Sequence, residues 1–122
     1  MKNKNQFFIG KVKDYQKGKG WFFGQFMDEG LLQSDLVEIA WENISNKKPE
    51  TKDKHYHKNS VEINIVISGW VKIGINSKIY QIEKGGFFNI YPYTIVESVE
   101  TGPETAVICI RAPSVKKDKF IL

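Results

Sequence analysis

Apolar and polar residues alternate along most of the chain, in short runs that are separated by turn residues. The clearest run is 61–68, where Val61, Ile63, Ile65 and Ile67 are spaced two apart. A period of two is typical of a β-strand, because successive side chains point to opposite faces of a sheet. Similar patterns predict further strands at 7–9, 21–23, 36–41, 71–75, 78–82, 87–91, 95–100 and 105–111.

Turn signals divide these runs. Asn76 and Ser77 alone separate the strands at 71–75 and 78–82, which is the length of a two-residue hairpin. Gly102-Pro103 predicts a second hairpin, between 95–100 and 105–111.

The remaining segments show less regularity. The polar, lysine-rich segment 43–53 is predicted to be a surface loop, and 31–35 to be a short helical turn. We expect the polar start, 1–5, and the tail beyond Pro113 to lie on the surface, with 120–122 as an apolar end available for docking.

Composition agrees with the strand pattern. Aromatic and β-branched residues are abundant, whereas alanine and leucine are few. A length of 122 residues suits one domain and is enough to bury a hydrophobic core. The sequence therefore predicts a single all-β domain over 1–122, built as a sandwich or a rolled barrel.

Charge and cysteine content exclude several classes of protein. The net charge is +4, but Arg111 is the only arginine among the 18 basic residues, and the lysines are scattered rather than gathered into a nucleic-acid-binding stripe. The single cysteine, Cys109, cannot form an intramolecular disulfide, and its apolar neighbours indicate a buried, inert thiol. No apolar run could cross a membrane or serve as a secretory signal. We therefore expect a cytoplasmic protein that binds neither nucleic acid nor membrane.

His55 and His57, the only histidines in the chain, form the strongest candidate site. They lie two apart in an extended stretch, so their imidazoles share one face. Glu62 follows a short turn and would return beside the pair on the next strand. Two imidazoles and a carboxylate are ligands that iron, manganese, nickel or zinc would accept. The interpretation as ordinary surface histidines is weakened by the position of Glu62.

The spacing of these residues resembles that of a motif in a known family. His55-Tyr56-His57, then Glu62, then Gly69 resembles the first conserved motif of the cupin superfamily in spacing, although Pro49 stands where the motif opens with glycine. The resemblance covers about 54–111, and leaves 1–53 as N-terminal strands and a loop. It implies a double-stranded β-helix, or jelly-roll barrel, that holds one divalent metal ion through the two histidines and the glutamate.

The second cupin motif is only partly present. Gly86 and Pro92 match, but Thr94, Glu97 and Thr101 occupy the positions of its glycine, histidine and asparagine. Strict alternation would also place Glu97 on the same face as Ile95 and Val99, inside the barrel. The resemblance thus makes Glu97 a candidate fourth ligand, a general base beside the metal or a structural partner of a lysine.

The alternation of side chains around Glu62 conflicts with its predicted position inside the barrel. Its face continues as Asn64, Val66 and Ser68, while the opposite face is a row of apolar side chains that would ordinarily be buried. If Glu62 points into a barrel, that row lies outside and needs a cover, either the N-terminal strands or a second subunit. We therefore expect a homodimer.

Three functional hypotheses remain open from the sequence. The first is a metal-dependent enzyme acting on a small polar metabolite, an oxygenase with iron or an isomerase or decarboxylase with another ion. The second is a module that binds or senses a sugar or another small molecule without turning it over. The third is a metal-free barrel that has lost its activity. Arg111 could bind an anionic group, but its interpretation as a surface or interface residue is favoured.

Overall fold

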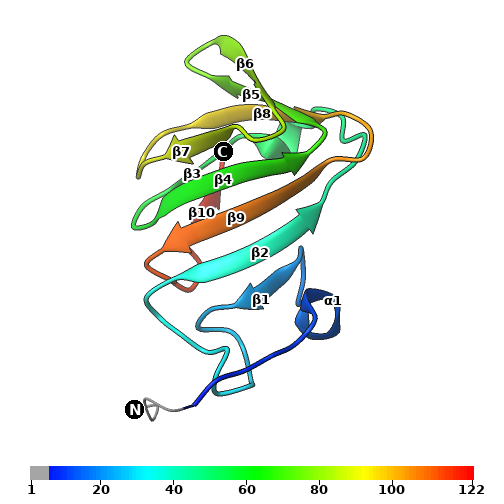
Figure 1. Cartoon of the computed structure of the whole chain (residues 1–122). Coiled ribbons are helices and arrows are strands. Elements are labelled where there is room, and N and C mark those ends of the chain that lie inside the picture. The colour runs from blue at the N-terminus through cyan, green and yellow to red at the C-terminus, as the bar shows by residue number, and fades with distance from the viewer. Residues whose placement is uncertain (1–5) are drawn as a thin grey trace.

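The chain folds into two antiparallel sheets that face each other and roll into a barrel, as a computed structural model of the protein shows for residues 6–122 (Figure 1). The polar start, 1–5, lies outside the described residues. The elements are α1 (Val12–Tyr15), β1 (Trp21–Phe23), β2 (Glu38–Asn43), a 3₁₀ turn η1 (Thr51–Asp53), β3 (His55–His57), β4 (Val61–Ser68), β5 (Trp70–Ile75), β6 (Lys78–Glu83), β7 (Phe87–Ile90), β8 (Val96–Thr101), β9 (Ala106–Ala112) and β10 (Lys119–Ile121).

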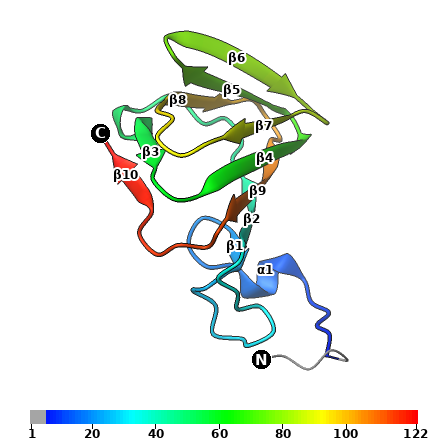
Figure 2. The ribbon, with the colours of Figure 1, turned by 90° about the vertical axis from the view of Figure 1, so that its left-hand side faces the viewer.

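Within residues 6–122, each sheet has five strands. One runs in the order β1-β2-β9-β4-β7 and the other in the order β10-β3-β8-β5-β6. Viewed from the side, the strands of the two sheets enclose a common interior, with β1 and α1 below it (Figure 2). This arrangement confirms the predicted all-β jelly-roll barrel. Among the described residues, no helix has the length and apolar character needed to span a membrane.

Several strands lie where the sequence predicts them. β4 has the predicted bounds, and β5 and β6 form a hairpin across Asn76 and Ser77. Both turn residues have positive φ, 54° and 61°, the conformation of the turn that matches the twist of a two-residue hairpin. The predicted strand at 7–9 does not form, and 31–35 contains a non-helical turn instead of a helical one. α1 was not predicted from the sequence.

The predicted hairpin between 95–100 and 105–111 is wrong. β8 pairs with β3 and β5, whereas β9 pairs with β2 and β4 in the other sheet. The segment at Gly102 therefore crosses from one sheet to the other. Its backbone lies so close to the Trp70 ring that a Cβ at Gly102 would be 2.3 Å from ring atoms, which explains the glycine. A turn signal shows that the chain reverses, but not which strand it then meets.

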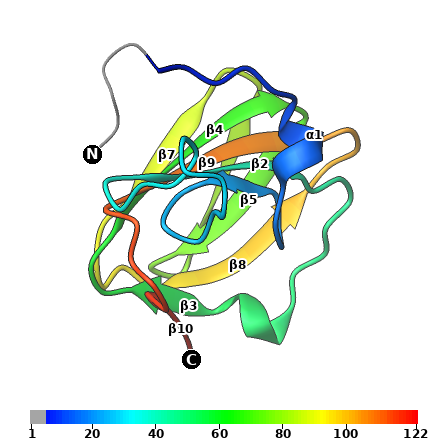
Figure 3. The ribbon, with the colours of Figure 1, turned by 90° about the horizontal axis from the view of Figure 1, so that it is seen from below.

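The C-terminal tail docks as a strand. β10 pairs with β3, and the ring of Phe120 stacks on Tyr56 with centroids 5.4 Å apart. Seen from below, β10 and β3 close the barrel opposite β2, β9 and β4 (Figure 3). Just before β10, the buried carboxylate of Asp118 accepts hydrogen bonds from the backbone N–H groups of Lys58, Asn59 and Ser60. It thereby fixes the turn between β3 and β4.

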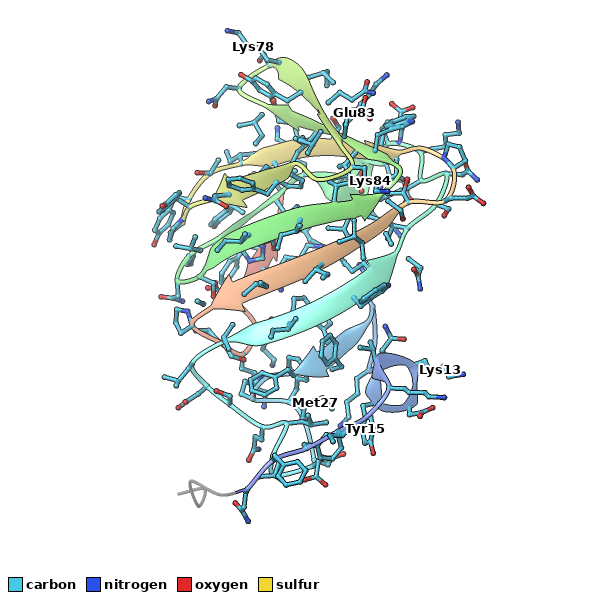
Figure 4. The ribbon with its side chains drawn as sticks, in the orientation of Figure 1. Lys13, Tyr15, Met27, Lys78, Glu83 and Lys84 are labelled. Carbon is cyan, nitrogen blue, oxygen red and sulfur yellow. The ribbon has the colours of Figure 1, made fainter. Side chains whose placement is uncertain are left out.

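The apolar core lies between the sheets. Two buried clusters, Val66 with Val71 and Val107, and Ile73 with Ile90 and Val96, line the interior. Charged side chains such as Lys78, Glu83 and Lys84 stand on and beside the β5–β6 hairpin, at the opposite end of the molecule from Met27 and Tyr15 (Figure 4). These charged side chains lie outside the two buried clusters, as is usual for a solvated exterior.

Candidate functional site

The turn between β3 and β4 brings the two predicted histidines and Glu62 together. His55 and His57 are both buried and face the interior, while Tyr56 between them stacks on Phe120 and Tyr93 outside. Because Asp118 holds the turn, β4 starts at Val61 and its second residue, Glu62, points inward. The patterning conflict is thus resolved in favour of a buried glutamate, with 9 % of its surface exposed.

The two imidazoles have different surroundings. His55 Nδ1 lies 2.6 Å from the carbonyl oxygen of Asp53. A carbonyl can only accept, so Nδ1 carries the proton and Nε2 keeps its lone pair. Burial lowers the pKa of His55, which favours the neutral ring. His57 is 1 % exposed, and neither ring nitrogen has a hydrogen-bond partner among the described residues. Its Nε2 lies 3.4 Å from Glu62 Oε2.

Arg111 is the residue that sequence reasoning misplaced. It is not a surface residue: its side chain is 19 % exposed and points into the barrel from β9. The strand register places Arg111 directly between Glu38 on β2 and Glu62 on β4. Its Nε donates to Glu62 Oε2 at 2.7 Å, and its Nη1 lies 3.5 Å from Glu38 Oε2. The ring of Trp21 lies over the guanidinium, 4.6 Å from its carbon.

This network sets the charge of Glu62. Burial alone raises the pKa of its carboxyl, but the contact with His57, the charge of Arg111 and the hydrogen bonds from Asn64 and Arg111 together outweigh burial and hold the pKa far below its usual value. Asn64 adds a hydrogen bond to Oε1 at 3.0 Å. Conversely, burial lowers the pKa of Arg111, but the nearby acidic groups, Glu62 first and Glu38 among them, together raise it above its usual value. Glu62 and Arg111 therefore form a charged, hydrogen-bonded pair inside the barrel.

The pair opens onto a cavity. Its volume is about 200 Å³, and its walls combine apolar side chains of both core clusters with the polar groups around Arg111. Val71, Val96 and Val107 form part of the apolar wall, and His55, Glu62 and Asn64 part of the polar one. A concave, largely apolar space with a few convergent polar groups is the usual form of a small-molecule site.

Glu97 does not join this site, which corrects the expectation that it points into the barrel. A bulge interrupts the pairing of β5 and β8, so that Gly74 opposes Ser98 and Ile75 opposes Val96. The bulge lets Val96 and Val99, three residues apart, both line the cavity. Glu97 is turned outward instead, where its carboxylate accepts the Ser77 N–H at 2.7 Å. Strict alternation of inward and outward side chains assumes no bulge, so the sequence pattern could not reveal that Glu97 points outward.

The three metal ligands that the cupin resemblance implies fit this geometry only in part. His55 offers a free Nε2. Among the described residues the two buried nitrogens of His57 accept or donate no hydrogen bond, and Nε2 only faces Glu62 Oε2 at 3.4 Å, so both imidazoles suit a divalent ion. Glu62 is less well placed, because Arg111 already holds its Oε2. Over residues 6–122, no three His, Cys, Asp or Glu side chains converge closely enough to hold a metal ion. The carboxylate would fit only after leaving Arg111.

Comparison with known proteins supports the fold. No protein-family model matches the chain, and no curated protein matches it either. Among solved structures, Streptomyces Pac13, a nucleoside dehydratase that has been solved with uridine, superposes with a TM-score of 0.71 at 11% identity, covering 96% of this chain and 92% of its own.

Two other structures agree. A Klebsiella pneumoniae protein with a double-stranded β-helix domain gives a TM-score of 0.67 at 16% identity, over 99% of this chain and 96% of that one. KdgF from Halomonas sp. gives 0.58 at 17% identity, over 68% and 75%. The chain has the cupin double-stranded β-helix fold.

Proposed function

We propose that this protein is an enzyme that acts on a small polar metabolite inside the barrel, by acid–base chemistry of the isomerase, decarboxylase or dehydratase type. The observation that carries the proposal is the cavity of about 200 Å³ with the Glu62–Arg111 pair and His55 at its wall. A buried cation and neighbouring carboxylates can orient a polar substrate and stabilise charge that develops on it. Pac13 supports the reaction type as a nucleoside dehydratase of similar fold.

The second candidate is a binding module that captures the metabolite without converting it, because the same cavity would serve both roles. The two functions differ in turnover, so a binding screen must come first. A thermal-shift screen with uridine, sugars and organic acids should identify ligands, since binding to the folded state raises the melting temperature. Enzymatic function then requires that a stabilising compound be consumed.

The cavity can be tested with a matched pair of variants. Asn64→Leu alters the wall of the cavity, whereas Gln81→Leu makes a similar polar-to-apolar change at an exposed position of β6 in the other sheet, away from the cavity. We expect the stabilising effect of the best ligand to be lost in the first variant and kept in the second. Equal ligand responses in both variants would place the binding site elsewhere and contradict the proposal.

We also propose that one divalent ion, iron, manganese, nickel or zinc, can bind through His55, His57 and Glu62, in competition with Arg111 for the carboxylate. Such an ion would polarise a substrate oxygen, or with iron support oxygen chemistry. Arg111→Ala frees Glu62 and removes a positive charge, so it should tighten binding of Mn²⁺ or Zn²⁺ at least about tenfold, because one lost charge repulsion is worth on the order of 1.4 kcal/mol or more.

Isothermal titration of protein without a histidine tag measures this effect. His57→Ala should abolish binding both in the wild-type background and in the Arg111→Ala background. An unchanged affinity in Arg111→Ala would show that Glu62 and Arg111 do not compete with the ion. If neither the wild type nor any variant binds the ion, the proposed metal site is wrong.

The apolar outer face supports a homodimer as the partner. Two rows cross four strands in register: Ile39, Ile110, Ile63 and Asn89, then Trp41, Ile108, Ile65 and Phe87. Neither row contains a charge, and Phe87 is 64% exposed. β1 extends the sheet at its edge beside β2. The four strands span about 14 Å, and an uncharged apolar face of this kind can pack against the same face of a second copy, as a twofold interface requires.

Sedimentation of the wild type should therefore give twice the chain mass of 14.1 kDa at micromolar concentration. Phe87→Glu places a charge in the face and should yield monomers. The control is Ile79→Glu, a residue 63% exposed on β6 of the other sheet, which should remain dimeric. A monomeric wild type contradicts the dimer.

A further inference from the structure

Glu42 is a carboxylate in the barrel that no side chain of residues 6–122 neutralises by an ion pair. It lies on β2 between the outward-facing Trp41 and the exposed Asn43, and its side chain lines the cavity. The other buried acids among residues 6–122 are all engaged: Glu38 with Arg111 and Ser114, Asp53 with Lys47, Glu62 with Arg111 and Asn64, and Asp118 with the backbone of the turn at 58–60. Within the described part of the chain, Glu42 makes no hydrogen bond and no ion pair.

An unpaired half-buried carboxylate is costly and calls for an explanation. Burial, and then the negative charge of Glu62, raise the pKa of Glu42 to about 7. The positive charges that face it, on Arg111, Lys19 and Lys119, only partly oppose this shift. Glu42 and Glu62 are thus neighbouring carboxyl groups whose environments push their pKa values in opposite directions, a pattern typical of sites that divide acid–base work between two groups.

Two lysines stand where this cavity meets solvent. Lys19 precedes β1 and Lys119 begins β10, and both are exposed while also lining the cavity. Neither has an ion pair among residues 6–122. The proximity of Lys19 and Arg111 helps to lower the pKa of Lys119, after burial. Cationic groups that repel one another at the mouth of a cavity are arranged to receive an anion.

We propose that Glu42 exchanges a proton with the substrate, and that the substrate is a small anion whose carboxylate or phosphate group is held by Lys19 and Lys119. This inference rests on the proposed function, because it identifies the substrate class of the same cavity. In the step itself, the carboxylate of Glu42 gains the proton as a substrate C–H or O–H bond breaks. The electron pair stays on the substrate, facing Arg111, and the proton is returned to the product at a different atom.

The role of Glu42 is tested by carbon-detected NMR titration of the glutamate carboxyl groups, with Glu42 assigned from its absence in Glu42→Gln. We expect one carboxyl of the wild type to titrate near pH 7 and to disappear from the spectrum of this variant. A Glu42 carboxyl that titrates at the usual pH of an exposed glutamate would overturn its proton-transfer role. This measurement needs no ligand, so it stands even if the proposed function fails.

The substrate class is tested by thermal shift with three matched compounds, glucose, glucuronate and glucose 6-phosphate. We expect at least one of the two anions to stabilise the protein more than glucose does, and the anion that binds identifies carboxylate or phosphate recognition. Lys19→Gln/Lys119→Gln should lose that preference, whereas Lys78→Gln/Lys84→Gln, at the far hairpin in Figure 4, should keep it. Stabilisation by glucose equal to that by both anions would overturn the inference and leave the proposed function standing. If none of the three stabilises the protein, the substrate class is wrong, and the wider ligand screen decides the proposed function.

Discussion

Replacing Arg111 by leucine should lower the free energy of unfolding by about 3–5 kcal/mol, the usual cost of removing one partner of a buried ion pair. The side chain holds Glu62 at 2.7 Å and lies 3.5 Å from Glu38, and both carboxylates are buried. Leucine would fill much of the space but leave two negative charges in the barrel without their cation. Denaturation in guanidinium chloride at pH 7 measures the loss.

A second substitution separates charge from packing. Glu62→Gln removes one of the stranded charges and keeps the shape of the side chain, so it should restore part of the stability when added to Arg111→Leu. If Arg111→Leu costs less than about 1 kcal/mol, or if Glu62→Gln destabilises it further, Glu62 and Arg111 do not form a charged pair inside the barrel.

Glu42→Gln should stabilise the protein at pH 8. The pKa of Glu42 is raised by burial from 4.5 to about 7, so the folded state binds its proton more tightly than the unfolded state does. Below the unfolded pKa both states carry the proton and there is no cost. As the pH rises from 4.5 to about 7, the unfolded state ionises while the folded state still holds the proton, so stability is lost over this range, and the loss is complete above pH 7. The expected gain for glutamine is about 2 kcal/mol at pH 8, after allowance for partial exposure, and about zero at pH 4.

Melting temperatures across this pH range provide the measurement. The control is Glu83→Gln, an exposed carboxylate on β6 that lies outside the cavity, and it should change stability little at either pH. A Glu42→Gln variant that is less stable than the wild type at pH 8 would mean that the carboxylate makes a favourable contact, contrary to its unpaired position.

The sequence predicted only part of the site, because in this barrel several strands turn their apolar face outward and a polar or charged face inward. In β4 the isoleucines face outward and Glu62 faces inward, and the histidine motif was needed to recognise this. The same reversal applies to β2 and β9, whose inward positions include Glu42 and Arg111. Extending the orientation of Glu62 to its neighbouring strands would have found both residues, but the pairing of β4 with β9 and of β9 with β2 is not encoded locally.

Other features depend on contacts far apart in the chain. Glu97 was assigned to the interior because its neighbours alternate, yet a bulge opposite Gly74 and Ile75 turns it outward. The apolar run at 7–9 has the composition of a strand but does not pair with another strand. In contrast, the β5–β6 hairpin was predictable, because two turn residues determine it.

The most direct test of the account is an NMR titration that follows two side-chain reporters in the cavity, the Asn64 amide and the Arg111 Nε–H. Both donate to Glu62 and both groups line the cavity. On addition of the best ligand from the thermal-shift screen, we predict saturable shifts of both signals with the same dissociation constant. Ligand-induced changes confined to the outer faces of the sheets, with both reporters unmoved, would contradict a substrate site inside the barrel.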